Sequence, residues 1–153
     1  MRSINNQSTS ISQKTPIHIW LVGIIALFLN SIGGYDFVMT LSKNNDYFSS
    51  LGYGTAQIDY FNNYPLPLAV FWFVGVWAAI AGSLFILLRL KFSKNLFLIA
   101  IVGQVVLDAY TFFFKHRWEV LGPKLCIQDL VILGFTIFLA IYSSHLAKHK
   151  LLK

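Results

Sequence analysis

Six polar side chains stand inside long apolar stretches of this sequence, where their chemistry requires an explanation. They are three carboxylic acids and three amides: Asn30, Asp36, Gln104, Asp108, Gln128 and Asp129. Carboxylate oxygens bind hard cations and exchange protons, and amide groups both donate and accept hydrogen bonds. One interpretation is therefore a polar cavity that binds a cation, a proton or a small polar ligand.

The same side chains support a second interpretation, in which they hold helices together. Polar groups that hydrogen-bond between helices in lipid contribute about 0.6–2 kcal/mol each. In this interpretation Asp108 pairs with Lys115 or Arg117, close to it in the sequence. The sequence leaves the two interpretations open.

No arrangement of catalytic or metal-binding residues accompanies these side chains. The single cysteine, Cys126, excludes an internal disulfide and a cysteine-based zinc site. His145 and His149 are four residues apart, but this spacing without a neighbouring glutamate is a weak metal signal. The sequence has no nucleophile–base pair and no glycine-rich phosphate loop, so we expect neither enzymatic activity nor a cofactor nor a metal site.

The elements that must position these residues are transmembrane helices. The chain has 153 residues, of which 56% are hydrophobic and 12% charged, whereas soluble domains are about 25% charged. Apolar runs of about 20 residues are long enough to cross a bilayer. We predict four spans, at about residues 16–41, 67–89, 94–114 and 125–146.

The sequence thus predicts an all-α integral membrane four-helix bundle. Its membrane domain is expected to cover residues 16–147, between a disordered N-terminus (1–15) and a basic tail (148–153). The four prolines of the chain lie at or just before the predicted helix starts, where a missing N–H has no cost.

The distribution of lysine and arginine predicts the orientation. Eight of them fall on the side of the two termini and four on the other side, so the positive-inside rule places both termini in the cytoplasm. The formal net charge is +6, but the basic residues are spread between apolar runs, and we expect no nucleic-acid partner. The first span also resembles a signal peptide, although its continuation as far as Thr40 favours a retained helix.

Helical phase tests whether the polar groups can converge. Gln104 and Asp108 share one stripe of the third span, because residues four apart lie on one face of a helix. Asp36 lies about 120° away from Asn30 around the first span. Either Gly33 and Gly34 bend this helix, or Asp36 faces water or a different neighbour.

Two further segments carry packing signals. Gly75, Ala79 and Ser83 recur every four residues on the second span, a pattern that allows close helix approach either inside one bundle or in a dimer. The long outer loop, residues 43–65, is rich in tyrosine and phenylalanine. We expect it to lie over the outer end of the bundle, with a short helix near residues 55–63.

Three stretches together resemble a known family: LNSIGGYDFVMT in the first span, YPLPLAVFWFVGVWAAIAGSLFILLR in the second, and NLFLIAIVGQVV at the start of the third. The resemblance covers about residues 17–150 and is to small bacterial four-helix inner-membrane proteins, loosely labelled sugar-transporter-like or hypothetical membrane proteins. It implies four spans in the bacterial inner membrane, and Tyr35 and Asp36 match the family's pattern. It transfers no catalytic or binding residue.

Two functional expectations follow. The first is transport or sensing of a small polar solute or cation through an outer-facing polar cavity, with the bilayer and a second copy of the chain as partners. The second is a non-catalytic accessory or scaffold subunit of a larger membrane complex.

Overall fold

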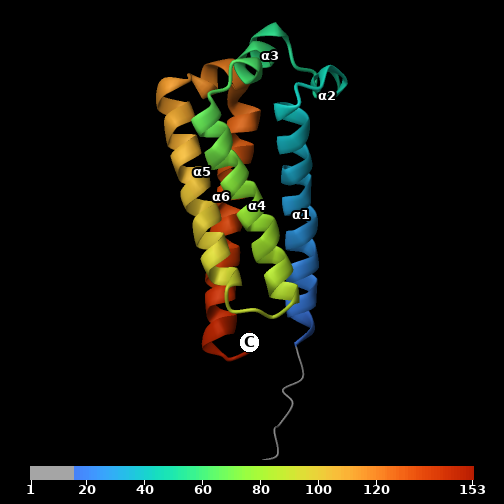
Figure 1. Ribbon diagram of the computed structural model, residues 1–153, viewed down its shortest axis with the longest axis vertical. Helices are drawn as coiled ribbons and strands as arrows, with labels where there is room; N and C mark the ends of the chain where they lie inside the picture. Colours follow the sequence, from blue (N-terminus) through green and yellow to red (C-terminus); the bar gives the residue numbers. More distant parts are fainter. Residues whose placement is uncertain (1–15) are drawn as a thin grey trace, which may run out of the picture.

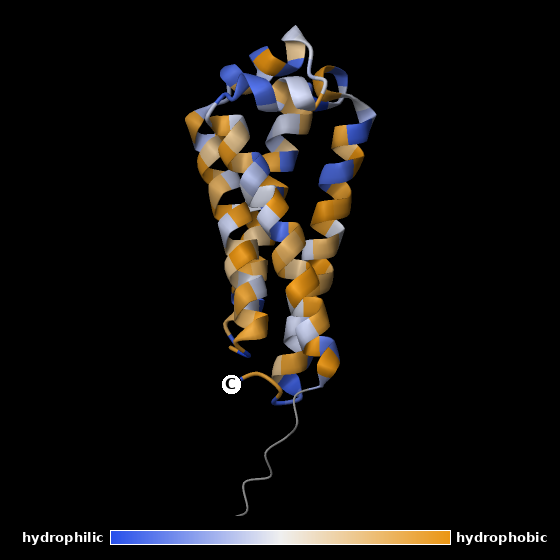
Figure 2. Cartoon of the chain, turned by 90° about the vertical axis from the view of Figure 1, so that its right-hand side faces the viewer, coloured by the Kyte–Doolittle hydropathy of each residue, from blue (hydrophilic) through white to orange (hydrophobic). Residues whose placement is uncertain are grey.

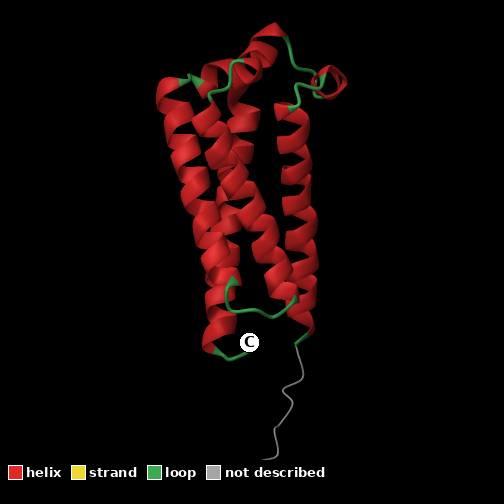
Figure 3. Cartoon of the chain, viewed as in Figure 1, coloured by secondary structure: helices red, strands yellow, loops and turns green. Residues whose placement is uncertain are grey.

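The computed structural model describes residues 16–153, and every element in this part of the chain is a helix (Figure 1, Figure 3). The six helices are α1 (Ile17–Leu41), α2 (Asn45–Ser50), α3 (Thr55–Asn62), α4 (Leu66–Leu87), α5 (Ser93–Phe114) and α6 (Arg117–Lys148). Four of them, α1, α4, α5 and α6, are long and apolar enough to cross a membrane. The predicted all-α bundle of four membrane helices is confirmed. The N-terminal segment that we expect to be disordered lies outside the described residues.

The fourth long helix begins earlier than the predicted span. A break interrupts α6 at Gly122, which has φ 79° and ψ 169°. Only glycine adopts this positive φ without strain, and Pro123 follows it with a φ suited to the first turn of a helix. The membrane-crossing part of α6 therefore begins at the break, and Arg117–Leu121 forms a separate turn before it.

The long helices pack in a fixed order around α4. Helix α4 packs against α1 on one side and α5 on the other, and α5 packs against α6. The backbones of α4 and α5 approach closely at Gly75 and Gly103, where an added Cβ on Gly103 would lie 3.1 Å from the Gly75 nitrogen. Helices α1 and α6 meet at one end, where Ile19 and Leu139 belong to the same buried cluster, but their backbones approach each other less than those of the other neighbouring helices. The bundle thus has a seam between its first and last helices that is open only in its other half.

One end of the bundle, which we call the tail end, is tightly closed. It carries the start of α1, the α4–α5 turn and the C-terminus (Figure 1). Its core contains Ile19, Ile86, Phe97, Leu139 and Leu146. Here the phenolic O–H of Tyr142 and the Nδ1 of His18 lie 2.6 Å apart in a hydrogen bond between α6 and α1.

The C-terminal residues are part of this closed end. The Lys91 amide donates to the Lys153 carbonyl over 2.9 Å, and the Arg89 Nε donates to the Leu151 carbonyl over 3.0 Å. Leu152 is 2% exposed. The predicted basic tail therefore docks its backbone against the α4–α5 turn.

The opposite end is covered by residues 43–65, which we call the lid. Helix α3 confirms the short helix expected near residues 55–63, whereas α2 was not predicted. Asn44 starts α2, because its side-chain oxygen accepts a hydrogen bond from the Tyr47 amide over 2.8 Å. Phe48, Tyr60 and Phe61 of the lid form a buried cluster with Leu121. The predicted aromatic segment thus packs on the end of the bundle.

The distribution of apolar and hydrophilic residues over the bundle is the one expected for a protein surrounded by lipid. Apolar residues dominate the long helices, and hydrophilic residues gather at the two ends and recur along the helices in the half next to the lid (Figure 2). Large side chains such as Leu21, Ile24 and Phe28 on α1 and Val131 and Ile141 on α6 are exposed. An exposed apolar belt of this extent matches acyl chains rather than water.

Candidate ligand-binding cavity

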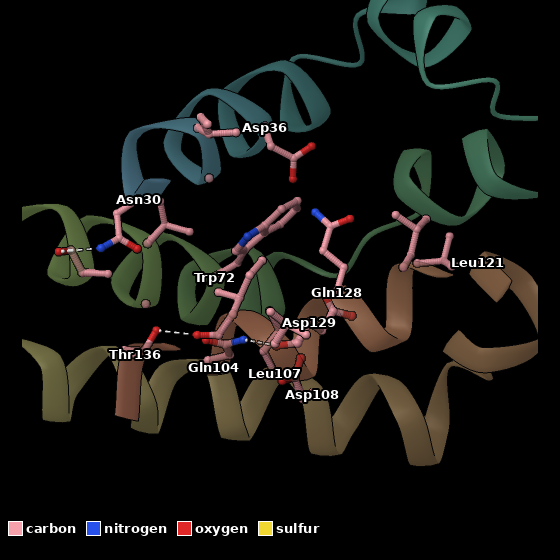
Figure 4. Close-up of a pocket in the computed structure, with 18 of the residues that line it drawn as sticks. Asn30, Asp36, Trp72, Gln104, Leu107, Asp108, Leu121, Gln128, Asp129 and Thr136 are labelled. Carbon is pink, nitrogen blue, oxygen red and sulfur yellow. Dashed lines mark hydrogen bonds between the residues drawn. The ribbon is translucent and has the colours of Figure 1, made fainter. Parts of the chain in front are cut away.

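A cavity of about 880 Å³ lies between the four long helices in the half next to the lid (Figure 4). All six polar residues singled out from the sequence line it: Asn30, Asp36, Gln104, Asp108, Gln128 and Asp129. They come from three helices, α1, α5 and α6. The structure thus brings together side chains that are up to 99 positions apart in the sequence.

Asp36 reaches the cavity without a bend in α1. The helix is continuous from Ile17 to Leu41, and Leu29, Gly33 and Asp36 follow a 4–3 spacing that borders the cavity. Asn30 and Gly34 are buried on the neighbouring stripe. Asn30 and Asp36 point in different directions around α1, but both line the cavity because it is wide enough to border both stripes of the helix. The two lie on the same cavity wall (Figure 4).

The ion pair in the cavity differs from the predicted one. Arg117 pairs with Asp129, with the guanidinium Nε 2.7 Å from the carboxylate Oδ2, and not with Asp108. Lys115 instead donates to the Asn63 carbonyl over 3.5 Å and lies over the ring of Tyr60. The prediction of an Asp108 pair with either cation is wrong. His116, with a left-handed φ of 47°, reverses the chain and directs Arg117 over α6.

Two amides of the cavity are already satisfied by the protein. The Asn30 side-chain nitrogen donates to Ser83 Oγ over 2.9 Å, and the Gln104 side-chain nitrogen donates to the Asp129 carbonyl over 2.9 Å. These bonds join α1 to α4 and α5 to α6. For these two residues the helix-contact interpretation describes the geometry.

Asp108 is different because one of its carboxyl oxygens has no partner. The residue is 8% exposed, and its Oδ2 makes no hydrogen bond with the described residues. A buried polar oxygen without a partner costs about 1–3 kcal/mol or more. Asp36 has one hydrogen bond from the lid, since the Tyr47 hydroxyl donates to its Oδ1 over 2.6 Å. The Oδ2 of Asp108 therefore keeps unused accepting capacity, although this oxygen is itself shielded from solvent.

Aromatic rings form the part of the cavity wall next to the lid. The ring-bearing residues of this wall are Tyr47, Tyr53, Phe61 and Tyr64 of the lid and Trp72 of α4. Tyr64 and Trp72 meet edge to face with their centroids 5.8 Å apart. The aromatic content of residues 43–65 predicted that this segment covers the end of the bundle. It did not predict that its rings line a cavity. Trp72 was missed because its span is aromatic throughout.

The glycines of α1 and the small residues of α4 that the sequence analysis singled out lie in three different environments. An added Cβ on Gly33 would meet nothing within 4 Å, whereas one on Gly34 would lie 2.8 Å from the Ile80 side chain. Gly75 packs against α5, and Ser83 and the Ala79 carbonyl accept hydrogen bonds from Asn30. The small stripe of α4 thus packs inside the bundle, and a dimer that uses it stays a prediction.

The carboxylates share the cavity without forming a metal cage. Among residues 16–153, no three His, Cys, Asp or Glu side chains lie close enough to hold a metal ion. Asp36 stands on the opposite wall from Asp108 and Asp129 (Figure 4). The three carboxyl groups therefore lie on two different walls of the cavity.

The open seam between α1 and α6 gives the cavity a lateral side. Leu29 and Ile32 of α1 and Val131 and Ile132 of α6 line the cavity and are exposed, each by 41% or more. The lid covers the end of the cavity, and the closed tail end seals the other. The lining also includes the exposed polar side chains of Lys124 and Gln128. The cavity is thus covered by its lid and open at the side, between α1 and α6, where both apolar and polar residues are exposed.

Burial gives the lid tyrosines a measurable pH signature. Desolvation, reinforced by the charge of Asp36, raises the pKa of Tyr53 to about 12, and desolvation also raises the pKa values of Tyr47, Tyr60 and Tyr64. An unfolded tyrosine releases its proton near pH 10. Between pH 10 and about 12, unfolding therefore releases a proton from Tyr53, and stability falls as the pH rises.

We expect Tyr53→Phe to make the loss of thermal stability between pH 10 and 12 shallower than in the wild type. Thermal melts in detergent across this range measure the slope, and tyrosinate absorbance measures the titration directly. An identical slope in both proteins would contradict the burial of the Tyr53 side chain between the lid and the end of the bundle.

The helices, their apolar belt and the enclosed polar cavity define an integral membrane four-helix bundle. Comparison of the chain with protein-family models, with curated proteins and with solved structures found no match.

Proposed function

We propose that this protein binds a small polar or cationic solute in the cavity between α1 and α6, as the first step of transport or sensing. The observation that carries the proposal is the cavity of about 880 Å³ itself, which is lined by Asp36, Asp108 and Asp129. A scaffold that used its polar groups only to join helices would leave no space of this size beside them, because protein interiors are close-packed.

The test asks whether a water-soluble reagent enters the cavity. Gly33 lines the cavity and Gly134 does not, and an added Cβ meets nothing within 4 Å at either position. Cysteine can therefore replace either glycine without a clash. Both variants are made with Cys126→Ala, so that the introduced thiol is the sole one.

We expect a charged methanethiosulfonate reagent to label Gly33→Cys at least tenfold faster than Gly134→Cys in membranes. Gly134 lies on an open face of α6 that the apolar belt assigns to lipid, where thiols stay protonated and unreactive. Equal, slow labelling of both positions would overturn the proposal and leave the accessory or scaffold role as the better account.

The orientation and the membrane belong to the same proposal. The tail end carries Arg89, Lys91, Lys94, Lys148, Lys150 and Lys153, and the lid end carries Lys43, Lys115, Arg117 and Lys124. We place the tail end in the cytoplasm by the positive-inside rule, and the lid outside. In line with the resemblance to small bacterial four-helix proteins, we assign the protein to the bacterial inner membrane. A homodimer or a larger membrane complex stays a prediction.

A further inference from the structure

We propose that the ligand of this cavity is an amphipathic organic cation, an ammonium group carried on an alkyl chain, which enters from the bilayer between α1 and α6. This inference rests on the proposed function and adds the chemical class of the ligand and its path. Four features of the described residues support it: the charge balance, the aromatic wall, the apolar floor and the lateral opening.

The charge balance of the lining favours a cation. Arg117 and Asp129 neutralise each other at 2.7 Å. Asp36 and Asp108 then have no basic side chain within salt-bridge distance among residues 16–153. Lys124, the other basic residue of the lining, is exposed. An ammonium group between Asp36 and Asp108, which both line the cavity, would bring a group of opposite charge next to them.

The aromatic wall favours an ammonium group over a small hydrated ion. Tyr53, Tyr64 and Trp72 line the end of the cavity that also contains Asp36 and Asp108. The faces of aromatic rings attract organic cations by about 0.5–2 kcal/mol per contact, more when water is excluded, and such rings recur where proteins bind quaternary ammonium groups. Figure 4 shows the indole of Trp72 and the carboxyl group of Asp36 in the same region of the cavity.

The rest of the lining suits an alkyl chain. Toward the tail end the cavity is bounded by Val76, Ala79, Ala100, Ile132 and Phe135. The polar groups found there are internally bonded: Asn30 donates to Ser83, and the Thr136 hydroxyl donates to the Ile132 carbonyl over 2.9 Å. A chain in this space gains about 0.8 kcal/mol per buried CH₂ group when it comes from water.

The seam between α1 and α6 provides the entrance. Its edges, Leu29 and Ile32 on one side and Val131 and Ile132 on the other, are apolar and exposed, and the two helices meet only toward the tail end. Gln128 is exposed and points into the cavity from α6 (Figure 4). An amphipath in the bilayer could thus pass its chain sideways while its cationic group follows the polar residues at headgroup depth.

The probe is decyltrimethylammonium, titrated into the protein in dodecyl maltoside and followed by calorimetry. We expect saturable binding of this cation, weaker binding of tetramethylammonium because it lacks the chain, and no saturable binding of decyl sulfate. This comparison of headgroups needs no variant. Equal affinity for decyl sulfate, or for tetramethylammonium, would overturn the inference.

A pair of matched variants locates the binding site. The double variant Asp36→Asn and Asp108→Asn removes two carboxyl groups from the cavity, and the control Asp46→Asn and Asp59→Asn removes two exposed carboxyl groups from the lid. We expect the first to weaken decyltrimethylammonium binding at least tenfold and the second to leave it within twofold. The probe partitions into detergent micelles equally in both experiments. A difference in affinity between the two variants therefore measures binding in the cavity. Equal affinities in the two variants would contradict the site.

Failure of this inference is distinguishable from failure of the proposed function. If Gly33→Cys is labelled but decyltrimethylammonium does not bind, the cavity admits a solute of another class. If Gly33→Cys is not labelled and the cation does not bind, both proposals fall.

Discussion

Arg117→Met is expected to destabilise the protein by about 3–5 kcal/mol, the cost of leaving one member of a buried ion pair without its partner. The side chains of Arg117 and Asp129 are 12% and 20% exposed, so water replaces little of the lost contact. The pair also joins the turn before Gly122 to the membrane-crossing part of α6. Unfolding by added sodium dodecyl sulfate, followed by circular dichroism, measures the change in free energy.

Two further variants test whether the cost comes from the uncompensated charge. The double variant Arg117→Met and Asp129→Leu should recover much of the lost stability, because an apolar pair of similar volume often replaces a buried ion pair at no cost. Glu119→Gln removes the exposed contact with His116 at 3.7 Å in the same turn, and should change stability by less than about 0.5 kcal/mol. A double variant less stable than Arg117→Met would contradict this account.

Gly103→Leu is expected to separate α4 from α5 and to destabilise the protein by about 3 kcal/mol or more, at the upper end of overpacking costs. A Cβ on Gly103 would lie 3.0 Å from the Phe71 carbonyl oxygen and 3.2 Å from the Gly75 Cα. These are backbone atoms of α4, which cannot move aside as a side-chain tip can. The amount of folded protein in membranes and its resistance to sodium dodecyl sulfate measure the effect.

The matched control uses the same chemical change where space is free. Gly103→Ala and Gly134→Ala gain the same helix propensity, up to about 1 kcal/mol, but at Gly134 an added Cβ meets nothing within 4 Å. Gly134→Ala should therefore be neutral or stabilising, and Gly103→Ala should be less stable than it by about 1–3 kcal/mol. Equal stabilities of the two alanine variants would refute the close contact of α4 and α5.

The sequence predicted the elements of this fold because the information is local. Runs of about 20 apolar residues define membrane helices whatever their neighbours, and the prolines mark where they start. The aromatic content of residues 43–65 predicted a covering segment, and α3 lies where a short helix was expected. The six polar residues were found because charged and amide groups are rare inside such runs.

Tertiary structure alone decided which of these residues meet. The phase of α1 could not show where Asp36 points, because the cavity wall is set by the separation of α1 from α6. The partner of Asp129 could not be read from spacing, because the left-handed residues His116 and Gly122 turn Arg117 back over the bundle. Helical period fixes which side chains share a face, whereas loop geometry and packing between helices decide what that face contacts. The composition therefore determined a membrane bundle with polar groups inside it, and only the arrangement of its helices made them line one cavity.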